Sequence, residues 1–567
     1  MTEGASGRGA GLRELERIHA TYGGDAAGRK RACLERLERT RLESARAVLA
    51  FHEALCFLRA HPDDRAVLEL VVRLLEGFER RADLRRFRRE LADTGIAGTD
   101  LHYAFYQPQA RDLVERHPAA VEVDWRAFGG SERLQLWLEA LMLAAETPAL
   151  DEVKLSPRRW VERMKRPDET DAAFLVHAFD ALAGPPVQRR CALDVVDLPF
   201  RIRGGAGGPS RTLAHSGRAD VRFQTAPLDR SRPDLARAVR ERPASIRSVP
   251  PARARRLIAL ACDAMATRAR DLDSFSAGSP DDVRTIDLGD GLELVAIGLL
   301  PHERLVIEAL YGFLTLKNGV PVGYVMAGAA FRSSDVAYNV FETWRGGEAA
   351  HTYGRVLAAL RAFLGAESFC VVPYQLGHGN EEGLASGAWW FYQKLGFRPD
   401  DGQARALMER ELAATRRNPR HRSSRATLRR LATRTLYWSP GRRREDVIGR
   451  VPMERIALAV TDSVARRFGS ARARGARVLA REAAERLGLH DLRRWSRDER
   501  RAWERWSPIL LLLEGLERWS AADRRALVRV VRAKGGRRET DYLALFERHA
   551  PLKRALLRLA RSSPDYS

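Results

Sequence analysis

The run GAWWFYQKLGFRP at residues 387–399 predicts a helix that ends at Gly396 and leads directly into a short strand. Its apolar residues recur at three- and four-residue spacing, which places them along one helical face. Lys394 in the last turn and a glycine just after it are the usual chemistry of a helix C-terminus. An ordinary capped amphipathic helix would show the same pattern, so its meaning depends on the residues that precede it.

The segments before this helix alternate between strand and helix patterns. Asn318-Gly319 separates two apolar, β-rich runs, which is the strongest short-range signal for a hairpin. From residue 252 onward we predict the order helix, strand, hairpin, strand, helix, strand, helix, strand. The segments that carry this order are 252–272, 292–300, 303–317, 320–331, 337–344, 355–366, 367–376 and 387–399.

With this order and the closing pattern A-x-x-x-Y-x-K-x-G-F, residues 252–408 resemble the GNAT (N-acetyltransferase) superfamily. The resemblance implies a mixed α/β sheet whose fourth strand leads into the N-terminus of a helix. There the first backbone N–H groups would bind the pyrophosphate of acetyl-CoA or another acyl-CoA, because these amides are unpaired and the helix dipole favours anions.

The family's loop before that helix reads Q/R-x-x-G-x-G/A. Counting back from the helix end aligns Arg345 with the first position, Glu348 with the first glycine and Ala350 with the last. Glu348 departs from the pattern, and a carboxylate there repels a pyrophosphate unless it points away. Gly346 and Gly347 provide close backbone approach earlier in the loop. The resemblance therefore assigns CoA binding to Arg345, Gly346, Gly347 and Ala350.

Acyl transfer from a thioester to an amine needs a base for the amine proton and an acid for the departing thiolate. By the resemblance, Tyr392 of the closing helix is the candidate acid; packing against its aromatic neighbours is the alternative. Glu342 is the candidate base, because it is a carboxylate within a predicted apolar strand, Val340 to Trp344. Its alternative is an ion pair with a nearby arginine.

Other polar residues near this site have simpler explanations. Asn380, Glu381 and Glu382 could form a substrate rim, but they suit the start of a helix equally well. His351 and His378 flank the expected cleft without a third spaced ligand, so we predict no metal site. The five cysteines are far apart and odd in number, which favours buried free thiols.

The residues before 252 are predominantly helical. We predict a helical N-terminal region over 1–226, with a short strand-containing segment at 191–225 around the flexible loop 204–210. Strands are expected at 192–203 and 218–224. A Pro- and Arg-rich linker follows at 227–251.

Residues 409–567 read as a basic helical domain. Of the chain's net charge of +23, the segment 401–567 carries +21, from 41 Lys and Arg against 20 Asp and Glu. This asymmetry points to a polyanionic partner, either nucleic acid or an acidic protein or surface. A solvated arginine surface produced by a high-GC genome is the alternative, since only seven of the 97 basic residues are lysine.

The sequence thus predicts a multidomain, mostly α protein with a central α/β domain, a GNAT-like mixed sheet between helical N-terminal and basic helical C-terminal regions. Its uninterrupted apolar runs, such as Ile509–Leu513, are far shorter than a membrane span, and the N-terminus has no apolar signal-peptide core. We therefore expect a cytoplasmic, bacterial protein.

The expected function is acyl-CoA-dependent N-acyl transfer to an unknown amine acceptor, a small molecule or a protein. Two alternatives remain: an inactive GNAT-like scaffold whose basic domain binds a polyanion, and a transferase that uses an acyl-carrier or aminoacyl-tRNA donor.

Overall fold

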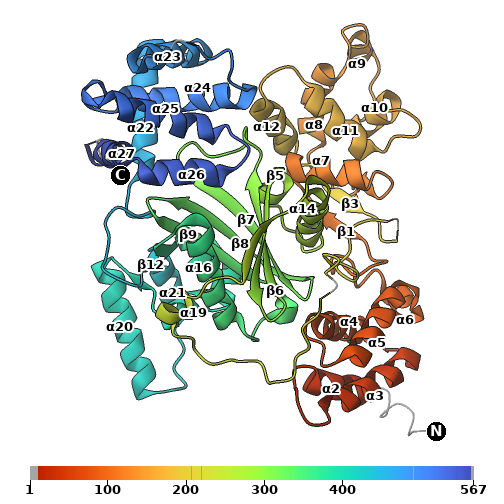
Figure 1. The fold of residues 1–567 in the computed structure, drawn as a ribbon. Coiled ribbons are helices and arrows are strands. Elements are labelled where there is room, and N and C mark those ends of the chain that lie inside the picture. The colour runs from red at the N-terminus through yellow and green to blue at the C-terminus, as the bar shows by residue number, and fades with distance from the viewer. Residues whose placement is uncertain (1–9, 206, 219, 490, 563–567) are drawn as a thin grey trace, which may run out of the picture.

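A nine-stranded sheet forms the centre of the molecule, with helices on both faces (Figure 1). The computed structural model describes residues 10–205, 207–218, 220–489 and 491–562. The strand order is β11-β12-β10-β9-β8-β7-β6-β5-β4. The strands are β4 (Ser245–Ser248), β5 (Gly278–Gly289), β6 (Leu292–Leu299), β7 (Ala309–Lys317), β8 (Val320–Ala330), β9 (Ser333–Val340), β10 (Ser368–Val371), β11 (Arg398–Pro399) and β12 (Leu436–Trp438).

The central strands are antiparallel neighbours buried on both faces. Leu294 and Ala296 of β6 belong to one apolar cluster, whereas Val295 and Ile297 belong to the cluster on the opposite face. This alternation is the period-two geometry of a strand. The predicted hairpin is confirmed: Asn318 and Gly319 both have positive φ, 49° and 80°, and join β7 to β8.

One pair of strands is parallel and separates along its length. Helix α16 (Ala349–Leu364) connects β9 to β10. The two strands pair in parallel only through Ser333–Asp335 and Ser368–Cys370. Beyond Asp335, β9 continues to pair with β8, while β10 ends at Val371. The sheet is therefore open between the C-terminal ends of β9 and β10.

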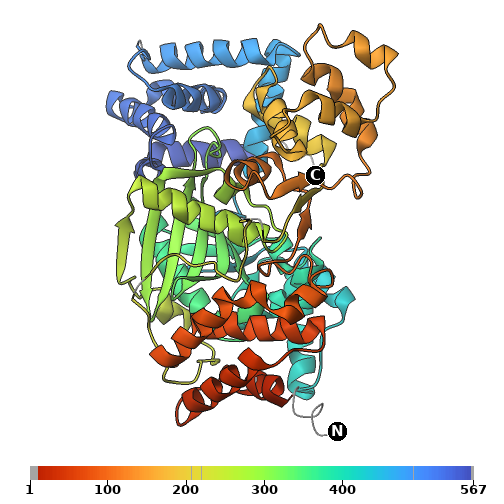
Figure 2. The same ribbon diagram turned by 90° about the vertical axis from the view of Figure 1, so that its right-hand side faces the viewer.

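Helix α16 covers one sheet face, and helix α14 (Pro251–Ala266) covers the other together with the N-terminal helices (Figure 2). The N-terminal group is α2 (Ala10–Ile18), α3 (Ala26–Arg39), α4 (Ala45–Ala60), α5 (Arg65–Glu76), η1 (Phe78–Arg80) and α6 (Ala82–Phe87). The elements near the open end of the sheet are α15 (Asp273–Ser276), η2 (Glu342–Trp344), α17 (Pro373–Leu376), α18 (Glu381–Ala385) and α19 (Ala388–Lys394).

A second, smaller body between residues 101 and 202 has an apolar core of its own. Its strands are β1 (Leu101–Tyr103), β2 (Val121–Val123) and β3 (Phe200–Ile202). Its helices are α7 (Gln107–Arg116), α8 (Ser131–Leu141), α9 (Pro148–Glu152), α10 (Pro157–Met164), α11 (Asp171–Ala181) and α12 (Pro186–Val196).

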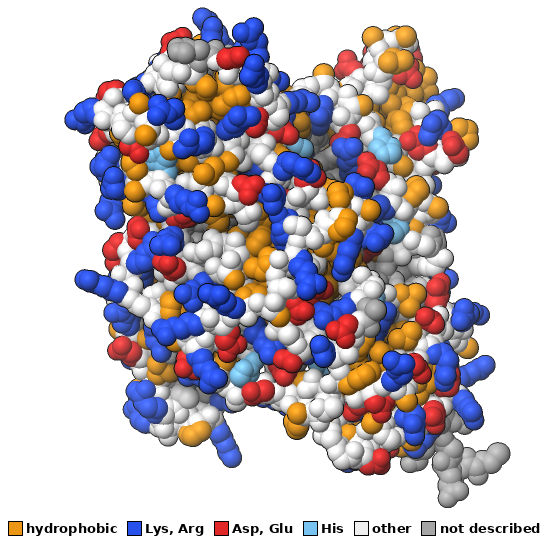
Figure 3. Space-filling model, viewed as in Figure 1, with side chains coloured by type: hydrophobic (Ala, Val, Ile, Leu, Met, Phe, Trp, Pro, Cys, Tyr) orange, Lys and Arg blue, Asp and Glu red, His pale blue; other side chains and the backbone are white. Residues whose placement is uncertain are grey.

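Among the C-terminal helices, α20 (Gly402–Arg417) contacts β11 and α21 (Arg425–Ala432). The helices from α22 onward form a separate group that docks on the sheet through α26, which contacts β7 and β8. This group is α22 (Met453–Phe468), α23 (Arg472–Leu487), α24 (Arg497–Leu512), η3 (Leu516–Arg518), α25 (Ala521–Lys534), α26 (Glu539–Arg548) and α27 (Ala550–Ser562). Basic side chains line the outer edge of this group at the upper left of Figure 3.

The predicted arrangement of helical flanks around a mixed sheet is confirmed. The boundaries between these regions differ from the predicted ones. The segment 227–251, expected to be a linker, holds α13 (Leu235–Ala238) and the edge strand β4. From the segment 409–567, β12 inserts between β10 and β11, because those two strands leave an unpaired position between them.

Four local predictions are wrong in whole or in part. Residues 192–196 continue helix α12 instead of forming a strand, and the described residues of 218–224 form none. The strand expected at 337–344 ends at Val340 and is followed by η2. Four cysteines are buried and free, but Cys191 is exposed. None of the helices in the described part of the chain is long and apolar enough to span a bilayer.

Candidate functional site

A cavity of about 510 Å³ opens where β9 and β10 separate; we call it the first cavity. Its walls come from β8, β9, the start of α16 and the segment 374–392. Residues 269–272, which follow α14, and Tyr103 from the smaller body complete it. Six stretches of chain thus converge on one space, at the opening where β10 stops pairing with β9.

Asp271 is the most perturbed carboxyl group on the first cavity. Its Oδ2 accepts a hydrogen bond from the backbone N–H of Tyr106 at 2.7 Å, while its buried Oδ1 has no partner. Burial raises the pKa of Asp271 to about 7, and the nearby carboxylates of Asp273 and Asp194 act in the same direction. A carboxyl group of this kind can take up a proton near neutral pH.

Tyr392 also lines the first cavity and is 3% exposed. Its ring packs edge-on against Tyr353 of α16, with centroids 5.5 Å apart, and a backbone hydrogen bond links its hydroxyl to Tyr338. Burial raises the pKa of Tyr392 above its usual range, so the phenol keeps its proton throughout the neutral range. Tyr392 therefore lies beside a cavity and packs against aromatic rings, and its role as the acid stays a prediction.

A carboxylate between two arginines borders the first cavity. Glu382 binds Arg270 at 2.9 Å and also pairs with Arg345, whose guanidinium donates a second bond to the Val340 carbonyl at 3.1 Å. These arginines hold the pKa of Glu382 below its usual value against the opposing effect of burial. This bridge fixes the loop before α16 to the segment before α19.

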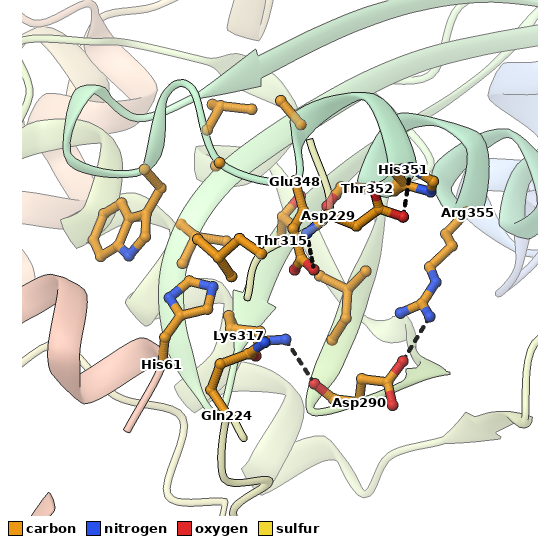
Figure 4. Close-up of a pocket in the computed structure, with 18 of the residues that line it drawn as sticks. His61, Gln224, Asp229, Asp290, Thr315, Lys317, Glu348, His351, Thr352 and Arg355 are labelled. Atoms are coloured by element: carbon orange, nitrogen blue, oxygen red, sulfur yellow. Dashed lines mark hydrogen bonds and ion pairs between the residues drawn. The ribbon is translucent and has the colours of Figure 1, made fainter. Parts of the chain in front are cut away.

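The residues of the loop before α16 line two different cavities. Gly346 and Ala349 line the first cavity, and Gly346 adopts a φ of +80° with open space where a Cβ would be. No side chain caps α16. Glu348 lines a different cavity, where its Oε1 accepts the backbone N–H of Asp229 at 3.4 Å (Figure 4). The carboxylate that departs from the family's pattern therefore points away from the first cavity.

Three of the other predicted positions lie away from the first cavity. Glu342 is an exposed residue of η2, so the expectation of a carboxylate within an apolar strand is wrong, and it lines neither of the two cavities. Gly347 lines the cavity that contains Glu348. Ala350 packs against the apolar cluster beneath α16.

This second cavity, of about 440 Å³, lies on the α16 side of the same sheet end. It is bounded by α16, by the strand ends at Asp290 and Lys317, by His61 and by the segment 222–229. Tyr338, Asn339, Val340 and Ala349 line both cavities, so the end of β9 and the start of α16 form a shared wall.

Sequence reasoning missed Asp271 and the second cavity. Asp271 follows a helix in an arginine-rich run and carries no motif, and the second cavity depends on segments more than 200 residues apart. Among the residues that the structure describes, no group of three or more His, Cys, Asp or Glu could hold a metal ion.

No family model, curated protein or solved structure matches this chain.

Proposed function

We propose that this protein transfers an acyl group from a CoA thioester to an amine, and that the first cavity is its active site. The observation that carries this proposal is the opening between β9 and β10 at the uncapped N-terminus of α16. Unpaired helix amides favour an anionic group such as a pyrophosphate, and the gap beside them admits a slender thioester arm. The resemblance of residues 252–408 to the GNAT superfamily supports the same reaction.

The residues at this opening suit the donor in three respects. Arg345 and Arg270 share the single carboxylate of Glu382, which leaves a net positive charge at the border. Gly346 leaves its backbone accessible, and Glu348 points into the second cavity. The last point matters because a carboxylate among the first amides would repel a pyrophosphate.

The chemical step transfers the acyl group directly. The amine nitrogen attacks the thioester carbonyl carbon, the C–S bond breaks and the electron pair leaves with sulfur as a thiolate. In this proposal Asp271 accepts the proton that the new amide nitrogen loses, and Tyr392 donates a hydrogen bond or a proton to the sulfur. Asp271 replaces Glu342 as the proposed base, because it lines the cavity and its pKa of about 7 suits proton transfer at neutral pH.

Calorimetry with acetyl-CoA and a longer acyl-CoA tests donor binding. Ser386→Trp places a large ring on the lining of the first cavity and should weaken binding at least about tenfold, whereas Ala385→Trp, one residue earlier and not on the lining, should not. Absence of binding to the wild type at millimolar acyl-CoA would reject the proposal and favour the scaffold alternative.

Release of free thiol from acetyl-CoA with a panel of amines tests the assigned residues. Asp271→Asn should lower kcat by about 100-fold or more, the usual contribution of a general base, with Glu342→Gln as the matched control. If Glu342→Gln lowered kcat more than Asp271→Asn, Glu342 and not Asp271 would be the base. Unchanged turnover in Tyr392→Phe would remove Tyr392 from the mechanism.

A further inference from the structure

Lys317 is a buried lysine that forms no ion pair with any residue in the described part of the chain. It lines the second cavity, it is 7% exposed, and its one recorded hydrogen bond is donated to the backbone carbonyl of Asp290 at 2.8 Å. No ion pair to it is found among the described residues. An ammonium group that is removed from water needs compensation by an opposite charge or by hydrogen bonds. Two of its three N–H donors remain available to the cavity.

The carboxylates around Lys317 are engaged with other groups. Asp290 pairs with Arg355 at 2.6 Å, and Asp229 pairs with His351 at 3.1 Å (Figure 4). Glu348 attracts Lys317 electrostatically without forming an ion pair to it, and its Oε1 is held by a backbone N–H. The carboxylates thus balance part of the charge on Lys317, but none of them contacts its ammonium.

Four further polar side-chain atoms of the second cavity are buried and lack a hydrogen-bond partner among the described residues. They are Nδ1 of His61, Oγ1 of Thr315, Nε1 of Trp344 and the acceptor Oδ1 of Asn339; the first three belong to residues that are 8%, 2% and 7% exposed. The indole nitrogen can only donate, and the threonine hydroxyl can donate or accept. Burial and the nearby charge of Lys317 lower the pKa of His61 to about 3, so its ring is neutral and one of its nitrogens also carries a donor hydrogen.

Part of the remaining wall is apolar, and the cavity is large enough for more than an ion. Phe57, Leu228, Leu292 and Val322 contribute to it. A volume of about 440 Å³ lies within the range of small-molecule pockets. Lys317, which forms no ion pair with any described residue, lies with several hydrogen-bond donors beside apolar side chains, and this combination suits an organic anion.

We propose that the second cavity binds a small organic anion, a carboxylate or a phosphate ester, whose charged group contacts Lys317 and whose apolar part rests against Phe57 and Leu292. This site is independent of the acyl-transfer proposal, because none of its anion contacts belongs to the proposed donor site. The shared wall formed by Tyr338 to Val340 and Ala349 places its occupant beside the first cavity.

Calorimetry on the full-length protein at fixed ionic strength tests this inference, with phenylacetate, phenyl phosphate, inorganic phosphate and phenethylamine as probes. We expect the aromatic anions to bind, inorganic phosphate to bind more weakly, and phenethylamine, the cation of nearly the same shape as phenylacetate, not to bind. The stronger of the two aromatic anions identifies the charged group as a carboxylate or a phosphate. Tighter binding of phenethylamine than of phenylacetate would overturn the proposal.

Lys317→Met locates the binding. It should weaken the binding of the preferred anion at least about tenfold, whereas Lys394→Met, the same change at an exposed lysine, should leave binding unchanged. Thr315→Val, which removes only a hydroxyl, should weaken binding by a smaller factor. Equal affinity in the wild type and Lys317→Met would place any anion binding on the basic surface and reject the site. The melting temperature without ligand shows that each variant is folded.

Discussion

Lys534 and Lys317 are both buried lysines, but their surroundings are opposite. Lys534, at the junction between the C-terminal helices and the sheet, is 3% exposed, pairs with Glu539 and donates to the Glu308 carbonyl at 2.7 Å. Lys317, at the second cavity, has one carbonyl partner and no paired carboxylate. Burial lowers the pKa of both, that of Lys534 to about 8.

The polar groups around the two lysines differ in the same way, in whether they have partners. At the junction, Arg304 donates to carbonyl groups of Leu299, Lys534 and Gly536, and Asp282 accepts from the Tyr311 hydroxyl at 2.8 Å. The second oxygen of Asp282 is buried without a partner among the described residues. By contrast, several buried polar side-chain atoms that line the two cavities have no hydrogen-bond partner among the described residues. We infer that the junction holds the C-terminal helices on the sheet, whereas the cavities keep polar groups available for ligands.

The largest expected effect is at the junction. Lys534→Met leaves the carboxylate of Glu539 buried without its partner, which typically costs about 3–5 kcal/mol of stability. Urea denaturation at pH 7 measures this loss. The control is Arg467→Met, which breaks a more exposed pair with Glu482 and should cost less than about 1 kcal/mol. Equal effects of the two changes would refute the structural role of the junction pair.

Asp271 should show a pH-dependent effect of intermediate size. Its folded pKa of about 7 lies above the unfolded value near 3.9, so the folded state binds the proton more tightly. The stability that this group contributes is therefore lost as pH rises from about 4 through about 7. Asp271→Asn should stabilise the protein by roughly 1–3 kcal/mol at pH 8 and by little at pH 4. A pH-independent difference between variant and wild type would contradict the assigned burial.

Lys317→Met should have the smallest effect and the opposite sign to Lys534→Met. It removes an unpaired buried cation and fills the space with an apolar chain, so we expect a gain of about 1 kcal/mol at pH 7. Because the folded pKa of Lys317 lies below the unfolded value, its charge opposes folding at low pH, and this penalty disappears as pH rises toward about 10.4. The gain should shrink accordingly in urea denaturation at pH 10. A loss comparable to that of Lys534→Met would show that Lys317 has a structural partner.

Local patterns could be predicted where one short segment decides the outcome. The Asn318-Gly319 hairpin follows from the left-handed backbone that these two residues tolerate, and Gly365 ends α16 for the same reason, with a φ of +71°. The strand expected through Trp344 failed because apolar composition continued after β9 had ended. For the same reason Glu342 was predicted to lie within a strand, although it belongs to η2.

The candidate site could be predicted only in part. Tyr392 and the loop at Arg345 and Gly346 were found because they belong to one continuous supersecondary unit. Asp271 could not be found, since its pKa depends on burial beside Tyr106 and on charges more distant in sequence. The insertion of β12 between β10 and β11 was missed because strand pairing over long sequence separation leaves no local signal.

By itself the sequence determined the elements: a period-two pattern for the central strands, glycine-dependent turns and a charge excess confined to the last 167 residues. The tertiary structure alone decided which buried charges have partners. The sequence does not distinguish these two buried lysines. Lys534 pairs with a carboxylate 5 residues away, whereas a cavity formed by distant segments lies beside Lys317. Compensation of a buried charge is a property of three-dimensional neighbours, and the order of residues along the chain does not fix these neighbours.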